Sequence, residues 1–384
     1  MIRHVVYECL PGVFAGGVQK MVFELASAQR RTGADVEVWT VDAPRAGSAE
    51  VFDGLTIRYF PPDPAWGYVR SRALIRELET SPPASILHAH STFHPLNHDV
   101  AVAARRLGRK LFFHPHGALD PALFGGWSLK SLKKRLYLRL IGIPDLDRSA
   151  GAFALTPLEA RQLASLGVRC PVIVLPNGIA PLAPASSADA ARFRSEHRIP
   201  SSARVILFVG RIMPKKRLED IVAAFARLRR GRPDLFLVVA GDPAQDVAYH
   251  RSLVAEADRL GCADALRWTG FLDERAKPAA FAAADCFVHA SVSEGMALAI
   301  LEALAAGLPV VATRGCYMRA AAAAEALLEC EQGPDALAAA LGQVLADDGL
   351  ARRLRENARA HARAEHDWDA LAVRCLAAYD SPRP

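Results

Sequence analysis

The sequence lacks the features that mark membrane-spanning and secreted proteins. No apolar run reaches the roughly 18 residues that a transmembrane helix needs. The first residues, Met1 to Tyr7, pass directly into a strand-like pattern, without the apolar core of a signal peptide. The seven cysteines are odd in number and scattered, and none form a C-x-x-C pair. These absences argue against a zinc or disulfide framework and lead us to expect a cytoplasmic protein with reduced thiols.

Two nucleotide-binding fingerprints are also missing. The sequence contains no G-x-G-x-x-G dinucleotide motif, which disfavours a dehydrogenase, and no G-x4-G-K-[S/T] loop, which disfavours a kinase or ATPase. The net charge of +6 is mild. It permits attraction to anionic phospholipid or phosphorylated substrates, and we expect no nucleic-acid partner.

The composition is that of an α/β protein with two domains. The chain has 384 residues, of which 51% are hydrophobic and 23% charged. A stretch rich in Pro, Ala and Ser, residues 180–191, predicts a linker near the middle of the chain. We therefore expect one domain over residues 1–179 and a second over residues 180–365.

The most informative stretch runs from Asp285 to Thr313. An apolar strand, Cys286 to Ala290, is followed by a polar loop that contains Glu294. A helical pattern begins at Met296 and stops at Gly307, and a second strand follows. The order strand, loop, helix, strand is typical of a parallel sheet covered by helices.

Two carboxylates in this stretch are placed to hold a nucleotide-sugar. Glu302 lies eight positions after Glu294, which corresponds to roughly 12 Å along a helix. That span matches the reach from a sugar ring, across a diphosphate, to a ribose. The helix start between them offers unpaired N–H groups to phosphate. Two glutamates at this spacing are, by themselves, most often surface residues.

Two further loops have residues suited to phosphate. The glycine-rich loop 11–17 ends in Gly16 and Gly17 before a helix, and a tight turn without a ligand is its alternative interpretation. Arg211 and Lys216 follow a strand and precede another helix, where cations suit a diphosphate. A solvated basic loop is the alternative there.

Histidines and aspartates raise the question of a metal. His88 and His90 project to the same side of one predicted strand, and His114 and His116 do so on another. Packing or substrate contact is the favoured interpretation, and we expect no metal site. The D-x-D sequence at residues 145–147 falls between a predicted helix and strand, so we interpret it as a turn.

The segment 128–140 predicts a basic amphipathic helix. Leucines recur at helical spacing, while the cations gather on the other surface: Lys130, Lys133, Lys134 and Arg135. An ordinary surface helix is one interpretation. Docking on an anionic membrane surface, where a lipid-linked acceptor would lie, is the other.

The motif S-E-G-x5-L-E-A-L-A-A-G-L-P-V-V-A-T resembles the donor-binding signature of the retaining glycosyltransferases of family four. G-R-x4-K resembles the diphosphate clamp of that family, in which Gly usually takes the place of Arg217. The resemblance covers nearly the whole chain. It implies the GT-B fold, in which two Rossmann-like domains face each other across a deep cleft. It also implies that the last helix, about residues 366–384, returns to the first domain.

The resemblance implies roles for individual residues. The expected catalytic residues are His116, Arg211, Lys216 and Glu294. The expected donor-binding residues are Gly16, Gly17, Gly270, Gly295, Met296, Ala297, Leu298 and Glu302. In these roles Glu294 contacts the donor sugar, Glu302 the nucleotide ribose, and His116 the sugar from the opposite side. No cofactor is expected, because the nucleoside-diphosphate sugar is itself a substrate.

The function that follows is transfer of a hexosyl group, with retention, from a UDP- or GDP-sugar to a saccharide or lipid-linked acceptor. By resemblance, chains with a P-H-G motif followed by a basic helix tend to build bacterial surface polysaccharides, and we expect this one to act in the cytoplasm or on the inner face of the cytoplasmic membrane. Two alternatives remain open at this point. One is another GT-B activity, a sugar-nucleotide epimerase or hydrolase, and the other is a non-catalytic sugar-nucleotide binding protein.

Overall fold

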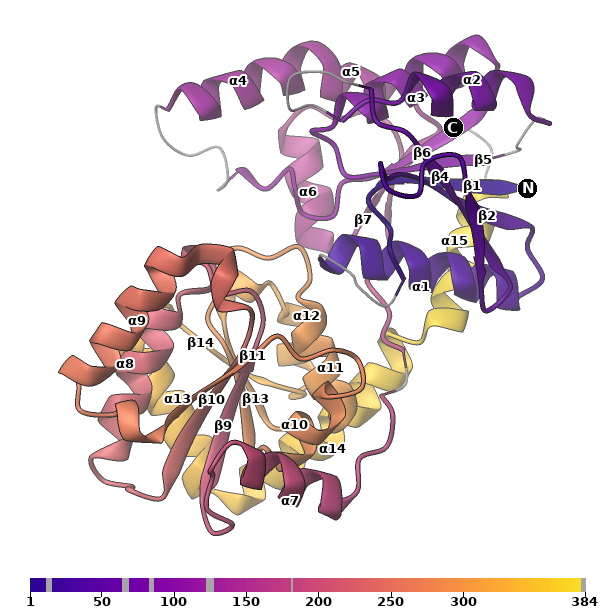
Figure 1. Ribbon diagram of the computed structural model, residues 1–384. Coiled ribbons are helices and arrows are strands. Elements are labelled where there is room, and N and C mark those ends of the chain that lie inside the picture. Colours follow the sequence, from indigo (N-terminus) through magenta and orange to yellow (C-terminus); the bar gives the residue numbers. More distant parts are fainter. Residues whose placement is uncertain (12–15, 64–68, 83–85, 122–127, 181, 381–384) are drawn as a thin grey trace. The chain divides into compact units, whose positions relative to one another are not determined.

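The structure is a computed structural model that describes residues 1–11, 16–63, 69–82, 86–121, 128–180 and 182–380. These residues form two compact units (Figure 1). The first unit combines Met1–Gly178 with Asp367–Pro384, and the second is Ile179–His366. Four residues of the glycine-rich loop, 12–15, lie outside the described ranges.

The described part of the first unit is built on one sheet, with strand order β3-β4-β2-β1-β5-β6-β7-β8. Neighbouring strands are parallel except β3 and β4, which are antiparallel. The strands are β1 (Ile2–Tyr7), β2 (Val36–Val41), β3 (Ala49–Phe52), β4 (Leu55–Phe60), β5 (Ile86–His90), β6 (Lys110–His114), β7 (Gly151–Ala154) and β8 (Val172–Val174).

Helices bury both faces of this sheet. The described helices are α1 (Gly17–Arg31), α2 (Arg72–Thr80), α3 (Pro95–Arg106), α4 (Leu129–Tyr137), α5 (Ile143–Asp147), α6 (Pro157–Ser165) and α15 (Trp368–Asp380). Helices α1 and α15 lie side by side over one face, where Met21 and Leu25 of α1 pack in one cluster with Leu371 of α15 (Figure 1). The chain therefore returns its last helix to the core of the first unit.

The second unit has a parallel sheet with strand order β11-β10-β9-β12-β13-β14 over the described residues. The strands are β9 (Arg204–Val209), β10 (Leu235–Ala240), β11 (Leu266–Gly270), β12 (Cys286–His289), β13 (Val310–Thr313) and β14 (Leu328–Cys330). The helices are α7 (Ser187–Glu196), α8 (Leu218–Arg229), α9 (Val247–Arg259), α10 (Lys277–Ala283), α11 (Leu298–Ala306), α12 (Arg319–Ala323), α13 (Pro334–Ala346) and α14 (Asp348–Glu365).

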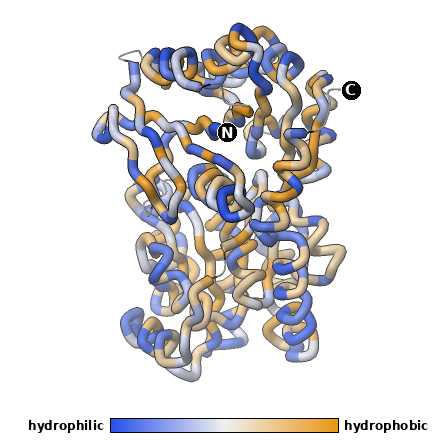
Figure 2. Tube along the Cα trace, turned by 90° about the vertical axis from the view of Figure 1, so that its right-hand side faces the viewer, coloured by the Kyte–Doolittle hydropathy of each residue, from blue (hydrophilic) through white to orange (hydrophobic). Residues whose placement is uncertain are grey.

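Two apolar layers stabilise the second unit, one on each face of its sheet. Phe225 of α8 and Leu341 of α13 belong to one layer, and Leu301 of α11 and Ala358 of α14 belong to the other. Figure 2 shows hydrophobic and hydrophilic residues alternating along the helices, as expected for elements that pack one side on a sheet.

The strand order reverses direction once within each sheet. In the first unit the chain proceeds outward from β1 through β2, and then resumes on the other side of β1 with β5. In the second unit β9 leads to β10 and β11 on one side, and β12 follows on the other. Open parallel sheets bind ligands beyond the carboxyl ends of their strands at such reversals. The loops after β9 and β12 therefore occupy the position that a ligand site requires.

Two boundaries predicted from the sequence were wrong. Residues 180–191 were expected to be a linker, but α7 begins at Ser187. Ser186 caps this helix: its side chain accepts from the Asp189 amide, and the Asp189 side chain accepts from the Ser186 amide, a pairing that nucleates helices. Helix α11 begins at Leu298 rather than Met296, with Ala297 as its extended cap. Within the described ranges, no helix is both long and apolar enough to cross a bilayer.

A row of buried histidines crosses the neighbouring strands β1, β5 and β6 of the first sheet. His4, His88, His90 and His114 are at most 1% exposed. Burial lowers the pKa of His4 to about 4, and it also lowers the pKa of His88, His90 and His114 well below the ordinary value. These rings are therefore neutral in the folded chain at neutral pH.

Acid should weaken the first unit through this row. Below pH 6.5 a histidine of the unfolded chain binds a proton, whereas the buried ring of the folded chain stays neutral. The free energy of unfolding therefore falls as the pH falls. Each such group lowers the free energy of unfolding by about 1.4 kcal/mol per pH unit, down to its folded pKa. We expect the urea midpoint of the first unit to fall between pH 7 and pH 5, and to fall less in His4→Gln.

Hydrogen–deuterium exchange of the urea-titrated full-length protein measures this midpoint, with peptides from β1 and β5 reporting on the first unit. His4→Gln removes one titrating ring and retains a hydrogen-bonding side chain. An equal pH dependence in the wild type and in His4→Gln would contradict the assignment.

Candidate functional site

The loop after β9 carries two of the predicted cations in different surroundings. Lys216 ends a short 3-10 turn, Pro214–Lys216, and is 8% exposed. Arg211 directly follows Gly210 and is exposed, and no described carboxylate lies within ion-pair distance of it. One cation is thus held inside the protein, while the other is available at the surface.

Arg217 takes the conformation for which glycine is best suited. Its backbone angles, φ 52° and ψ 43°, are left-handed. An L-residue usually avoids this region because its Cβ crowds the following carbonyl. The guanidinium donates to both carboxylate oxygens of Asp220, at 2.9 and 3.0 Å, and pairs with Glu219 at 2.8 Å. These bonds hold the turn in the shape that a glycine would allow, so the substitution leaves Lys216 in place.

Glu294 lies in the loop after β12, where several polar groups surround its carboxylate. Lys216 Nζ donates to Glu294 Oε1. Ser291 Oγ donates to the same oxygen at 2.5 Å, and His289 Nε2 lies 3.7 Å from it. Burial by itself would raise the pKa of this carboxyl, but His289 and the Lys216 charge bring the pKa below its usual range. Glu294 is therefore ionised.

A backbone contact joins the two loops. The amide of Val292 donates to the carbonyl of Lys215 at 3.0 Å. Because β9 and β12 are adjacent, with Phe287 paired to Leu207, their carboxyl ends deliver Lys216 and Glu294 to one place. The reversal of strand order therefore produces a largely buried ion pair.

Glu302 lies on α11, is buried, and has a different partner. It is 3% exposed, and Lys277 Nζ donates to its Oε1 at 2.6 Å. Lys277 is 7% exposed and also pairs with Glu274 at 2.7 Å. The second carboxylate of the predicted motif thus has its charge balanced by the first residue of α10.

The other predicted donor-binding residues of this unit lie at the same edge of the sheet. Gly295, Met296 and Ala297 connect Glu294 to the first residue of α11, Leu298, and Ala297 gives this helix start no side-chain cap bond. Gly270 ends β11 with φ 75°, and its carbonyl accepts from the amide of Gly241 at 2.9 Å. Both segments follow the carboxyl ends of parallel strands.

The remaining predicted residues belong to the first unit. Gly16 caps α1 and Gly17 is its first residue. His116 follows β6 with a left-handed φ of 57°, and its Nε2 lies 3.0 Å from His90 Nδ1. Burial lowers the pKa of His116 to about 3. The structure thus brings Lys216 and Glu294 into contact, whereas Gly16, Gly17 and His116 belong to the first unit.

The histidines of the first unit invite comparison with a metal centre. Two groups, His4/His88/His90 and His90/His114/His116, bring ring nitrogens within 4.8 Å of one another. However, His88 stacks on His90 at 4.2 Å between ring centroids, and His114 stacks on His116 at 3.9 Å. Each nitrogen lone pair lies in the plane of its ring, and two stacked rings have roughly parallel, separated planes, so their lone pairs do not converge on one ion. The geometry favours packing and hydrogen bonding over ligation.

The D-x-D carboxylates belong to α5 and have protein partners. Asp145 bonds His98 at 2.6 Å and Arg105 at 3.2 Å, and Asp147 bonds Arg169 at 3.0 Å. These residues form the end of a short helix instead of the predicted turn. Each carboxylate has a basic neighbour that compensates its charge.

Three residues near the predicted site were not singled out from the sequence. His289 and Ser291 contact Glu294, and Lys277 contacts Glu302. A buried polar residue at the end of an apolar strand, as in C-F-V-H, was an available signal for His289. Lys277 had no local signal, because its contact depends on how α10 packs near α11.

Comparison with known proteins places the chain in a family. The family described as "Glycosyl transferase 4-like domain" matches residues 16–178, and the family described as "Glycosyl transferases group 1" matches residues 189–361. The D-inositol 3-phosphate glycosyltransferase of Kineococcus radiotolerans is 30% identical over 398 residues, which cover 95% of this chain and 90% of that protein. The glycogen synthase of Mycobacterium tuberculosis is 27% identical over 399 residues, 96% of this chain and 92% of its own.

Solved structures show the same fold. Sucrose-phosphate synthase from Thermosynechococcus elongatus superposes with a TM-score of 0.79 at 22% identity, over 98% of both chains. Anabaena HepE in complex with UDP-glucose has a TM-score of 0.78 at 19% identity, over 98% of this chain and 99% of its own. The two units are the parallel-sheet domains of a GT-B fold, and the chain belongs to the glycosyltransferases that join a glycosyl transferase 4-like domain to a group 1 domain.

Proposed function

We propose that this protein is a retaining hexosyltransferase. The donor is a nucleoside-diphosphate sugar, with UDP or GDP as its nucleotide, and the acceptor is a saccharide or lipid-linked saccharide. The pathway is the synthesis of a bacterial surface polysaccharide. The nucleotide-sugar part of this proposal is supported by Anabaena HepE, which was solved with UDP-glucose.

One observation carries the proposal: the largely buried pair of Lys216 and Glu294 beyond the carboxyl ends of β9 and β12. An ion pair that is removed from water gains little net stability, because desolvation offsets the attraction. Fold stability is therefore a poor reason to place both charges here. A site that must meet a diphosphate and a sugar needs a fixed cation beside a fixed hydrogen-bond acceptor.

In the proposed reaction the bond between the anomeric carbon and the diphosphate breaks, and the leaving diphosphate takes the electron pair. Lys216 has three N–H donors, so it can keep its bond to Glu294 and still bind a phosphate oxygen. Arg211, which is exposed, would bind the diphosphate in two-pronged fashion. The uncapped start of α11 adds its amide dipoles. Together these groups stabilise negative charge as it develops.

Glu294 would then accept hydrogen bonds from the sugar hydroxyls, since it is ionised before the donor binds. Glu302 would bind the ribose while Lys277 balances its charge. His116 would contact the sugar. The acceptor hydroxyl attacks the anomeric carbon from the same face as that from which the diphosphate leaves. This route retains the configuration and requires no enzyme nucleophile. The proton of the acceptor leaves on the departing diphosphate.

Loss of either member of the ion pair should abolish most of the transfer. We expect Lys216→Met to lower kcat about 100- to 1,000-fold, the range found when one charge-stabilising donor is removed. Glu294→Gln should also lower kcat strongly, because the sugar hydroxyls lose a charged acceptor. The measurement is release of nucleoside diphosphate and of glycosylated acceptor, followed in parallel.

Arg259→Met serves as the control, because it removes an exposed cation from α9 that pairs with Glu256. This variant should retain normal turnover. Near-normal turnover of both Lys216→Met and Glu294→Gln would refute the site. If the protein released or isomerised the sugar and transferred it to none of a panel of saccharide acceptors, it would be a hydrolase or an epimerase instead of a transferase.

The nucleotide can be identified by ligand-induced stabilisation. A specific donor present at 100 times its Kd should stabilise the folded protein by about 2.7 kcal/mol, because it binds only the folded state. We expect one of UDP and GDP, with its sugars, to raise the Tm, and ADP and TDP to leave it unchanged. A stabilisation by UDP or GDP that persists undiminished in Lys216→Met would contradict the proposed diphosphate contact.

The membrane-facing part of the proposal rests on α4 and the π-helical turn after it, Leu138–Gly142. Four leucines that recur three or four residues apart are 55–79% exposed: Leu129, Leu132, Leu136 and Leu140. Exposed cations, Lys133, Arg135 and Arg139, lie among them; the Lys130 side chain is outside the described residues. We propose that this leucine face docks on an anionic lipid surface, where apolar insertion and charge attraction add.

Vesicle co-sedimentation tests this docking. We expect the protein to bind vesicles that contain phosphatidylglycerol more tightly than vesicles of phosphatidylcholine, by about 1 kcal/mol per cation near the surface. Leu132→Ser combined with Leu136→Ser should weaken binding to anionic vesicles. Val102→Ser removes an exposed apolar side chain from α3 and should not. Equal sedimentation with both lipids would sink the docking proposal.

A further inference from the structure

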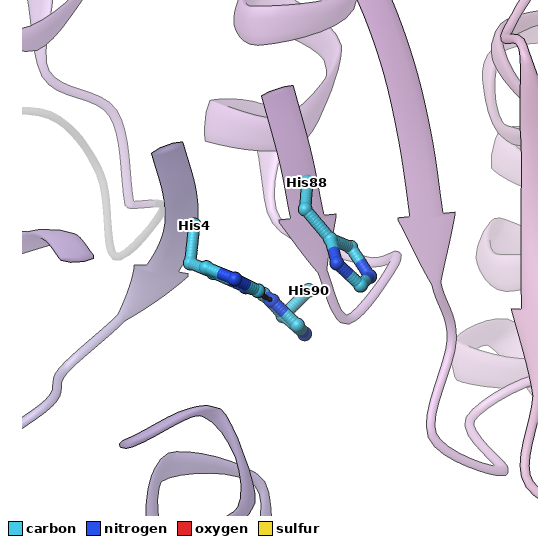
Figure 3. A group of neighbouring side chains, drawn as sticks. All are labelled: His4, His88 and His90. Carbon is cyan, nitrogen blue, oxygen red and sulfur yellow. Dashed lines mark hydrogen bonds between the residues drawn. The ribbon is translucent and has the colours of Figure 1, made fainter. Parts of the chain in front are cut away.

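A hydrogen-bonded chain of side chains runs through the first sheet and ends at His116. His116 Nε2 lies 3.0 Å from His90 Nδ1, and His90 Nε2 lies 2.9 Å from His4 Nδ1. His4 Nε2 lies 2.7 Å from Gln29 Oε1 on α1. Figure 3 shows the middle link, with His4 of β1 and His90 of β5 pointing toward each other and His88 beside them. One polar path thus connects a helix of the core to the predicted sugar-contacting histidine.

The chemistry of each link determines where every proton lies. The Gln29 carbonyl oxygen can only accept, so His4 Nε2 carries a proton and His4 Nδ1 is a bare acceptor. His90 Nε2 must then donate to His4, which leaves His90 Nδ1 as an acceptor. His116 Nε2 must in turn donate to His90. The chain therefore requires the Nε2–H form of His116, with a free lone pair on Nδ1.

The Gln29 amide also has a partner on its other side. Gln29 Nε2 donates to the hydroxyl of Tyr379 at 3.3 Å, and this hydroxyl lies 2.6 Å from His88 Nδ1. Because the hydroxyl accepts from Gln29, its one proton is free for His88. A flipped amide would reverse every donor and acceptor up to His116. The orientation of the Gln29 amide, with Oε1 toward His4 and Nε2 toward Tyr379, thus sets the direction of the chain.

The backbone of His116 is anchored independently of its ring. The next amide, Gly117, donates to Glu159 Oε1 at 2.6 Å, and the other oxygen of Glu159 accepts from Leu155 at 2.6 Å. Glu159 is 3% exposed. These bonds hold the left-handed turn at His116 in place, so the proton position is the remaining freedom of this side chain.

We propose that Gln29 is a positioning residue that fixes the tautomer of His116, so that Nδ1 of His116 is a hydrogen-bond acceptor for a hydroxyl group of the substrate. Part of this inference rests on the proposed function, namely that the group received by Nδ1 is a sugar hydroxyl. The tautomer itself rests only on the chain of bonds. The depressed pKa values of His4 and His116, at about 4 and 3, fit rings that stay neutral, as each link requires.

Nitrogen-15 NMR of the full-length protein, labelled at histidine, tests the tautomer. Two-bond proton–nitrogen correlations distinguish a protonated from a bare ring nitrogen, and loss of the signals in His116→Gln assigns them. At pH 7.5 we expect His116 Nε2 to appear protonated and Nδ1 bare. The opposite pattern in the wild type would overturn the proposal, and this result needs no core variant to fold.

Variants then test the origin of the tautomer. Gln29→Met keeps the side-chain length and removes the acceptor, so the two nitrogen shifts of His116 should move toward each other as both tautomers become populated. Leu25→Met, a buried change on the same helix, should leave them unchanged. Wild-type shifts in Gln29→Met would overturn the role of Gln29.

Kinetics separates this proposal from the proposed function. If both hold, Gln29→Met lowers kcat for transfer several-fold at unchanged nucleotide affinity, and Leu25→Met does not. If the NMR result stands while transfer by Gln29→Met is normal, Gln29 still fixes the tautomer. The proposed contact between His116 and the sugar is then the part that is wrong.

Discussion

The contact between Lys216 and Glu294 depends on strand order more than on any local feature. The two residues are 78 positions apart in the sequence. They meet because β10 and β11 extend the sheet on one side of β9, and β12 then pairs with β9 on its other side. Neither charge could be buried alone without a large desolvation penalty. Ser291 donates a further hydrogen bond to the carboxylate, so the pair is held by its surroundings as well as by attraction.

The first sheet reverses its strand order in the same way, between β1 and β5. The side chains at this reversal are neutral histidine rings rather than charged groups. His4 and His90 come from the two strands that meet there, and their bond is one link of the path to His116. One unit therefore places charge beyond its sheet, where a charged ligand would be stabilised. The other carries an uncharged hydrogen-bonded network through its interior, in which the position of one proton specifies all the others.

Two surface features differ in whether their energetic cost is offset by neighbouring residues. Arg217 occupies a left-handed position without being glycine, and its bonds to Asp220 and Glu219 offset the backbone cost. The leucines of α4 present the opposite case, since they stay exposed without compensation inside the described structure. An exposed apolar face of this kind commonly marks an interaction surface.

The sequence by itself determined the local elements and the residue types of the site. The strand, loop and helix around Glu294 follow from hydrophobic periodicity and from Gly307, and the GT-B fold followed from motif resemblance. Tertiary structure alone decided which side chains meet: Lys216 with Glu294, Lys277 with Glu302, and Gln29 with His4. Periodicity reports which face of an element is buried, because that depends on nearby residues. Partners across strands depend on strand order, which no local pattern encodes.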